Sequence, residues 1–486
     1  MVSKTGKESK GIFEYKGEWL DIGELERRVY SEAMAFGRQL LSKAIEAADQ
    51  KLAEQRDKSM YRDKGYRRTV LKTVMGEVEY QRHVYVVTDT QKGASAAIYL
   101  LDRHMGLDTV GLFSDTVCKM AVEAACAVSY RRAATEINDL TGLRLSHESV
   151  WRIVQDAGSW ERERVEKLAA AAKAENGAGA YETPVLYEEM DGVYLALQGQ
   201  DRKEYGSSKE LKLSIAYSGI HEDANGRRRL ENKVSCAGFE EAKIFRDHAE
   251  GVVASYYSVD KIKRRVFNSD GGAWLQRNMV PDCIYQLDLF HRNKAVRTCL
   301  NETGLQKTVL ELLYRGKVRK ALDVIEASIA STDDPVEQEK RRKLYSYFDN
   351  NKTALIPYYR RKGKQPPAPN EGQQPARCGS MESNVFTIIG NRMKHNRTCW
   401  SVNGGNNLAA LLALHHTGRL RPVLSEWAAN RRDASAYTVS DPLSACQVRD
   451  RFNDAYVPPH TLSGRDLPDS VKFILKMQPL SQIPLT

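Results

Sequence analysis

Three acidic residues stand apart from the many surface acids because of where they fall in the chain. Asp191 lies among aliphatic residues, Asp270 follows a short apolar run, and Glu382 comes 112 residues after Asp270. A carboxylate in apolar surroundings is costly unless it is paired or binds a metal ion. Converging carboxylates offer the oxygen ligands that Mg²⁺ or Mn²⁺ prefers. Two such ions about 3.5–4 Å apart can promote phosphoryl transfer to a water or a 3′-hydroxyl. The pattern predicts a site for two metal ions.

Each acid also has an ordinary structural explanation. Asp191 could be an acid at a strand edge, and Asp270 could belong to the turn that Gly271 begins. Glu382 could simply favour the positive end of a helix. The metal site is the better hypothesis because the three acids fall, in chain order, within a strand, at the end of a strand and at the start of a helix.

The elements that must position these acids can be predicted from residue patterns. Residues 183–197 indicate a strand around Asp191, and a later strand ends at Asp270 before Gly271 and Gly272. Ser380 is expected to cap a helix over 381–394 that carries Glu382. The other predicted elements are strands over 209–217, 232–239 and 283–291 and a helix over 240–257.

The resulting order is three strands, a helix and two strands, which predicts an α/β protein (an α+β multidomain chain) with a ribonuclease H-like core. The first part of this core is expected over 180–291. Residues 292–360 are helical in pattern and rich in lysine and arginine, and the family resemblance given below implies that they form a helical insertion in the core. Residues 361–430 combine a proline-rich loop with the helix of Glu382 and complete the core. Residues 431–486 have weak periodicity and are expected to form a C-terminal tail.

The N-terminal region, residues 1–110, is predicted to contain a long helix over 23–57 and a β-hairpin over 66–85 that turns at Gly76. One face of this hairpin is expected to be basic and could contact phosphates, although a merely solvated face explains the charges equally well. The residues of that face are Arg67, Arg68, Lys72, Arg82 and His83.

Residues 111–175 are predicted to hold a helix-turn-helix-like DNA-binding region. Ser129 and Ser146 are suited to cap two short helices on either side of a turn at Gly142, and a separate charged helix is expected over 159–173. The same pattern is common in helical proteins that bind nothing. The candidate DNA contacts are Arg131, Arg132, Arg144 and Arg152.

Composition narrows the class of protein and its surroundings. The net charge of +10 suits a polyanionic partner, and no apolar run is long enough to span a membrane. The eight cysteines include no C-x-x-C pair, which argues against a structural zinc site. The first residues lack the apolar core of a signal peptide. We therefore expect a cytoplasmic protein without a membrane partner, and the family resemblance given below implies a prokaryotic, nucleoid-associated one.

Several short stretches, taken in order, carry a resemblance to a known family. They are Met190-Asp191-Gly192-Val193, Ser269-Asp270-Gly271 with Trp274, Leu287-Asp288-Leu289-Phe290-His291, and Met381-Glu382-Ser383-Asn384-Val385 followed by Trp400-Ser401. Together with the hairpin around Gly76 and Tyr99-Leu100-Leu101-Asp102, this set resembles the DDE transposases of the ISLre group of insertion sequences, which are related to Mutator-like enzymes. One departure is Asn268-Ser269 before Asp270, where many relatives have a glycine-containing segment.

The resemblance implies a function and a set of site residues. Asp191, Asp270 and Glu382 would be the catalytic, metal-binding triad. Asp288 and His291 match a D-x-x-H motif, which makes His291 a further catalytic candidate; a hydrogen-bonded pair at a strand end is the equal alternative. The implied partners are double-stranded DNA, as terminal repeats of the element and as target, and further copies of the chain on that DNA.

The leading hypothesis is therefore a transposase that binds element ends, cleaves DNA and joins strands by metal-dependent phosphoryl transfer. Two alternatives stay open: a transposase-derived protein that binds DNA without catalysis, and a metal-dependent nuclease that does not join strands. The neighbouring acids Glu188, Glu189 and Asp260 are expected to have no metal role.

Overall fold

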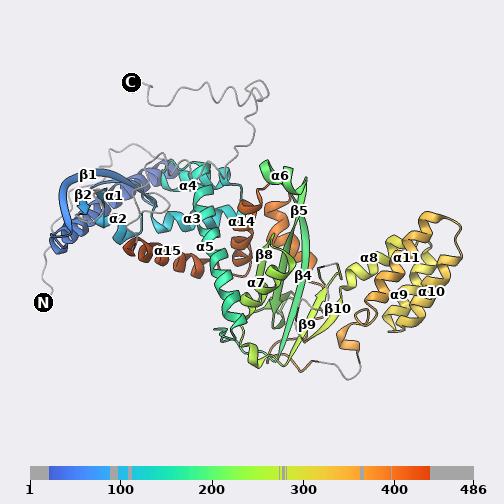
Figure 1. Ribbon diagram of the computed structural model, residues 1–486. Helices are drawn as coiled ribbons and strands as arrows, with labels where there is room; N and C mark the ends of the chain where they lie inside the picture. The colour runs from blue at the N-terminus through green and yellow to red at the C-terminus, as the bar shows by residue number, and fades with distance from the viewer. Residues whose placement is uncertain are drawn as a thin grey trace, which may run out of the picture.

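The computed structural model describes residues 21–87, 97–107, 112–272, 274–275, 280, 282–361, 366–395 and 397–437. Within these residues the protein is a mixed α/β structure, as predicted, with a central sheet between a helical N-terminal region and a lobe of four helices (Figure 1). No helix in the described part of the chain is long and apolar enough to cross a membrane. Most of the predicted tail, residues 438–486, lies outside the described residues, as do residues 1–20.

The central sheet has five strands in the order β10-β9-β4-β5-β8. The long strand β4 pairs antiparallel with β5, which pairs antiparallel with β8. On its other side β4 pairs parallel with β9, and β9 with β10. The strand bounds are β4 Val185–Ala196, β5 Ser208–Tyr217, β8 Val234–Gly238, β9 Arg264–Ser269 and β10 Cys283–Leu287.

Both faces of this sheet are covered, and the residues of β4 divide between two hydrophobic cores. Tyr187 and Val193 belong to the core shared with α14 (Val402–His415) and the helices before β4. Leu186 and Met190 belong to the core shared with α7 (Ala242–Ala254). Burial on two faces explains why β4 is rich in aliphatic and aromatic residues on both sides of its three acids, Glu188, Glu189 and Asp191.

The predicted order of strands and helix is present, with additions that the residue pattern did not indicate. A short helix, α6 (Gly199–Tyr205), precedes β5, and a hairpin of β6 (Gly219–Glu222) and β7 (Arg228–Glu231) separates β5 from β8. The prediction that β10 extends to His291 was wrong. The strand ends at Leu287 because Asp288 caps the following helix.

The N-terminal region contains the predicted helix and hairpin. They are α1 (Ile22–Gln55), β1 (Tyr61–Thr73) and β2 (Gly76–Val87), to which the short strand β3 (Ala97–Ile98) and helix α2 (Leu100–Met105) are added. The expected basic face was partly wrong, since two of its members are buried. His83 Nδ1 lies 2.6 Å from Asp49 Oδ2, and Arg82 is paired with Asp102. These pairs fix the hairpin to α1 and α2 and leave Arg67 and Arg68 exposed.

The helix-turn-helix candidate forms from the predicted capping residues. Ser129 caps α4 (Tyr130–Thr141), Gly142 ends it with φ +69°, and Ser146 caps α5. These helices pack on α3 (Asp115–Ala127). The separate helix predicted over 159–173 was wrong, because α5 continues from His147 to Lys173 without a break.

Gly158 marks the point at which that break was expected. A side chain at this position would overlap Asn407 of α14, so the glycine allows two helices to approach closely. This residue is a packing glycine inside a helix, and the sequence pattern alone does not distinguish it from a helix end.

The predicted insertion is helical throughout its main part. It contains α8 (Leu289–Cys299), α9 (Thr303–Tyr314), α10 (Val318–Ala330) and α11 (Pro335–Asn350), which form the lobe beyond β10 in Figure 1. After α11 the chain returns to the central sheet. Residues 362–365 of the proline-rich loop lie outside the described residues. The helix α15 (Leu420–Tyr437) follows α14 and continues into the segment predicted to be tail.

Candidate metal centre

The three predicted acids come from three distant segments that meet at one end of the sheet. Asp191 lies within β4, and Asp270 follows β9 directly. Because these strands are parallel neighbours whose ladder ends at Met190 and Ser269, the two aspartates leave the ladder side by side. Glu382 lies in α12 (Met381–Asn384), which packs on β4.

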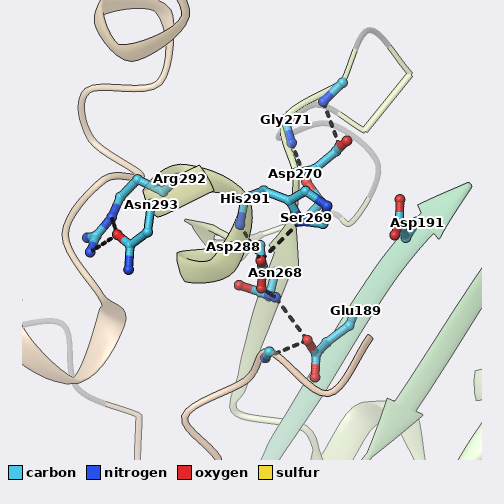
Figure 2. A network of polar contacts seen from close by, with 12 residues as sticks. Glu189, Asp191, Asn268, Ser269, Asp270, Gly271, Asp288, His291, Arg292 and Asn293 are labelled. Carbon is cyan, nitrogen blue, oxygen red and sulfur yellow. Dashed lines mark hydrogen bonds and ion pairs between the residues drawn. The ribbon is translucent and has the colours of Figure 1, made fainter. Parts of the chain in front are cut away.

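A fourth predicted residue completes the cluster. Asp191, Glu382 and His291 each offer a ligand atom within 4.8 Å of the other two. Asp270 is outside this tightest group but close enough for its charge to raise the pKa of Asp191 and of His291. Figure 2 shows Asp191 on its strand with Asp270 and His291 nearby on the neighbouring loop and helix. All four predicted site residues are therefore gathered at this end of the sheet.

The cluster is electrostatically strained as a set of bare acids. Burial raises the pKa of Asp191 to about 6, and the charges of Asp270 and Glu382 add to that effect. The backbone N–H of Gly192, 2.7 Å from Asp191 Oδ1, and the nearby His291 work in the opposite direction. A cation at this position would relieve the repulsion, which is the behaviour expected of metal-binding carboxylates.

His291 is held by its neighbour Asp288. Asp288 is the N-cap of α8 and accepts a hydrogen bond from the backbone N–H of His291 at 3.0 Å. Its Oδ1 also lies 3.1 Å from His291 Nδ1, and this contact is the first cause of a raised pKa for His291. The pKa of Asp288 is lowered: burial alone would raise it, but its hydrogen bonds with His291 and Asn268 outweigh that effect.

The residue that sequence reasoning missed is Glu189. Its side chain is fully buried and accepts hydrogen bonds from Tyr217 Oη at 2.7 Å and from Asn268 Nδ2 at 2.9 Å. It also accepts hydrogen bonds from the backbone N–H groups of Gly379 at 2.7 Å and Ser380 at 3.2 Å. Figure 2 shows Glu189 below Asp191, with its contact to Asn268. Glu189 thus ties β4 to the segment that delivers Glu382.

A signal for Glu189 was present in the sequence. Glu189 and Asp191 are two residues apart on a strand, so both side chains point to the same face. Glu189 lies on that face of a buried strand, two residues before Asp191, so its charge must be paired within the fold. Asn268 contacts Asp288 as well, at 3.1 Å, and so links Glu189 to the Asp288–His291 pair.

The prediction that Ser380 caps the Glu382 helix was wrong. Ser380 has helical backbone angles and its side chain makes no capping bond. Its backbone N–H is instead satisfied by Glu189, which takes the place of a local cap. The helix that follows is also not uniform, since a π-helical stretch, Val385–Gly390, joins α12 to α13 (Asn391–Met393).

The loop after Asp270 is held from two directions. Gly271 has φ +75°, and a side chain there would overlap Leu287. The Tyr347 hydroxyl, from α11, donates a hydrogen bond to the backbone oxygen of Asp270. The helical lobe therefore contacts the site directly and helps to fix the position of its second acid.

The four arginines predicted to contact DNA lie in the helix-turn-helix region and not at this end of the sheet. Arg131 and Arg132 are in the first turn of α4, and Arg132 pairs with Glu136 at 2.7 Å. Arg144 is exposed in the turn, and Arg152 pairs with Glu148 on α5. Arg131, Arg132 and Arg144 are exposed, whereas Arg152 is partly buried.

The fold and the site define a mixed α/β protein with a carboxylate-rich candidate metal centre built from three distant segments. The chain belongs to the uncharacterised protein family UPF0236, whose model matches residues 15–430. It is similar to a protein of Streptococcus gallolyticus described as "UPF0236 protein in vanSb 3′region". The two are 23% identical over 358 residues, which cover 71% of this chain and 72% of that protein.

Proposed function

We propose that this protein is a DDE-type transposase, which cleaves DNA at the ends of an insertion sequence and transfers the strands by metal-dependent phosphoryl transfer. The observation that carries the proposal is the convergence of Asp191, Asp270 and Glu382 beside His291. The same order of acids underlies the resemblance to the ISLre group.

The sheet supports a ribonuclease H-like assignment of the core. Its three antiparallel strands β8, β5 and β4 are followed by β9 and β10 in parallel, with α7 as the crossover between β8 and β9. In this arrangement the lobe α8–α11 would be an insertion between the second and third acids of the triad. The element order predicted from sequence has the same form.

The donor atoms fit Mg²⁺ or Mn²⁺. Carboxylate oxygens are the preferred ligands of these ions, and within the described residues the Glu382 carboxylate accepts no hydrogen bond. Asp191, Asp270 and Glu382 would hold the metal, two ions in this scheme. When bound, such ions activate the attacking hydroxyl and stabilise the leaving oxygen.

The remaining steps fall to the chain's own groups. Because Asp288 engages Nδ1 and favours the protonated ring, His291 is better suited to donate from Nε2 than to bind a metal. We assign His291 to hold a phosphate oxygen of the scissile strand. Glu189 keeps the segment of Glu382 in place, and Tyr347 does the same for Asp270.

The proposed partners follow from the same assignment. The exposed arginines of α4 and of the turn before α5 would contact the terminal repeats, and a homo-oligomer would pair two ends on the DNA. The setting would be the cytoplasm, in association with the nucleoid.

The decisive experiment uses the full-length protein, Mg²⁺ and DNA that carries the sequences flanking the gene. We expect cleavage at the repeat ends and 3′ ends joined to target DNA, both absent from Asp270→Asn. Cleavage without joined products would identify a nuclease. Sequence-specific binding without either product would identify a DNA-binding protein.

A further inference from the structure

A large basic cavity lies beside the helix of Glu382, apart from the four residues of the candidate metal centre. Its volume is about 1160 Å³, which is larger than the range of about 300–1,000 Å³ typical of small-molecule sites. It opens between the β6–β7 hairpin, the segment before α12 and the end of α14. Ser380 and Ser383, on either side of Glu382 in sequence, belong to its wall.

The wall of this cavity carries positive charge and no carboxylate. Its cationic residues are Arg228, Arg229, Lys233, Arg377 and Arg419. His416 also belongs to the wall but is neutral, because burial and the nearby His415 lower its pKa to about 4. Arg228 is neutralised by Glu222 at 3.0 Å. Within the described residues, Arg229, Lys233, Arg377 and Arg419 have no carboxylate oxygen within ion-pair distance. Such an accumulation of like charge is unfavourable unless a ligand supplies the anion.

Two of these cations are partly buried, which makes the lack of a neutralising anion more costly. Burial lowers the pKa of Lys233, and its Nζ contacts only a neutral partner, Asn384 Oδ1, at 2.9 Å. Burial likewise lowers the pKa of Arg419, whose guanidinium lies over the ring of Tyr256 at 4.8 Å. Neither contact neutralises a cation, although the charges of Glu161 and Glu426 act on Arg419 from beyond ion-pair distance.

The aromatic residues of the wall indicate which anion fits. Tyr256 and Tyr359 lie beside Arg419 and Arg377, and the Arg377 guanidinium is 5.7 Å from the Tyr359 ring centre. Cations that follow a backbone, with aromatic groups between them, are typical of sites for single nucleic-acid strands. The size of the cavity suits several nucleotides better than one free nucleotide.

We propose that this cavity binds the phosphates of a single DNA strand that leaves the candidate metal centre past α12. This inference rests on the proposed function for the identity of the strand. Glu382 belongs to the centre, whereas Ser383 and Asn384 belong to the cavity, so one short helix separates cleavage from strand retention. The same phosphate chemistry would also suit a free phosphate-bearing metabolite, and the experiment must separate the two.

The test compares charge-neutralised forms of the full-length protein in a chelator, so that metal binding plays no part. One form carries Lys233→Gln with Arg419→Gln, and the other carries Arg229→Gln with Arg377→Gln. The second pair is exposed and should not disturb folding. The matched control is Lys263→Gln with Arg264→Gln, an exposed pair at the opposite end of β9 from Asp270.

Affinity for a 20-nucleotide single strand, measured over a range of salt concentrations, is the main readout. We expect both cavity pairs to bind at least about tenfold more weakly than the control, with a salt slope smaller by about 0.7 for each lost phosphate contact. A strand with 4-thiothymidine should crosslink to peptides that contain Tyr256 or Tyr359. Affinity equal to the control for both pairs would overturn the proposal.

A second arm titrates pyrophosphate and a nucleoside triphosphate into the same proteins. If the cavity pairs lose only this binding and keep the strand, the site serves a free phosphate-bearing molecule and the proposal is wrong. Wild-type cleavage and joining are measured separately. If the variants with paired cavity substitutions join DNA and bind the single strand normally, only this inference is wrong. If the wild-type protein is inactive on end DNA, the proposed function is wrong.

Discussion

Two groups of carboxylates meet at the same end of the central sheet, and they differ in what their oxygens contact. Glu189 and Asp288, the inner acids, are 0% and 6% exposed and accept several hydrogen bonds from side chains and backbone. Asp191, Asp270 and Glu382, the outer acids, are more accessible. Asp191 and Asp270 each accept a hydrogen bond from a nearby backbone N–H, of Gly192 and Gly272.

This difference distinguishes carboxylates that stabilise the fold from carboxylates that are available to bind a metal ion. An acid whose oxygens are saturated by N–H and O–H donors is held by the fold and has little capacity left for a ligand. An acid that repels its neighbours and makes few bonds is costly to the apo fold and available to a cation. The predictions below test whether the two groups can be separated by experiment.

Replacing an outer acid should have the largest effect. Asp191→Asn, Asp270→Asn and Glu382→Gln should each reduce cleavage and joining below detection while DNA binding stays within about twofold, because the amide keeps the shape but removes the anion that holds the metal. Gel assays of end DNA with Mg²⁺ or Mn²⁺ would show this. Near-normal cleavage by a folded Asp270→Asn protein would contradict the assignment of that residue.

Replacing the inner acid Glu189 should damage both stability and rate. In Glu189→Gln the amide group would face the N–H groups of Gly379 or Ser380, which should cost about 1–3 kcal/mol in the free energy of unfolding. Displacement of the Glu382 segment should also slow cleavage up to about a hundredfold at temperatures where the protein is folded. Melting curves and single-turnover rates measure the two effects.

The matched control for this change is Glu188→Gln on the opposite face of β4. Glu188 is equally buried and is paired with Arg265 at 2.8 Å. It should lower the melting temperature without a specific loss of rate. Equal losses of rate in both variants would mean that Glu189 acts only through general stability.

Removing His291 should have a smaller effect than removing an outer acid. A hydrogen bond to a charged phosphate contributes about 1.5–3 kcal/mol, so His291→Ala should be about ten- to a hundredfold slower. Because Asp288 raises the pKa of His291, Asp288→Asn should move the decline of rate at high pH to lower pH. An unchanged pH profile in Asp288→Asn would argue that the pair is purely structural.

The smallest effect concerns the pH dependence of stability in metal-free protein. The pKa of Asp191 is raised from 3.8 to about 6 on folding, so the folded state binds the proton more tightly than the unfolded state. The contribution of Asp191 to stability is therefore complete below pH 3.8 and is lost as the pH rises through about 6. In chelator, Asp191→Asn should melt a few degrees higher than wild type at pH 7.5, and the difference should vanish near pH 4. A lower melting temperature for the variant at pH 7.5 would contradict this sign.

Local patterns predicted most of the elements that carry the site. Alternation, apolar runs and glycines located β4, the end of β9 and the helical lobe, and the serines before α4 and α5 are caps as expected. These features depend on residues close in sequence, which is why one sequence suffices for them.

Several of the failures depend on contacts between distant segments. Gly158 does not end a helix, because it lies within α5 where Asn407 packs against it. Ser380 is not a helix cap, and its backbone N–H instead donates a hydrogen bond to Glu189. His83 was assigned to an exposed basic face of the hairpin, but it is buried beside Asp49 of α1. Such partners cannot be inferred from spacing, since each lies at least 34 residues away from the residue it affects.

The late position of Glu382 has a consequence for synthesis of the protein. The third outer acid is translated 112 residues after Asp270, with the whole lobe α8–α11 in between. At about 5–20 residues per second, a ribosome needs roughly 6–22 s to cover this distance. During that interval the nascent chain holds two acids of the proposed triad and cannot complete the centre. Under the proposed function, a chain that terminates early inside the lobe would keep the proposed DNA-binding region without a complete metal centre.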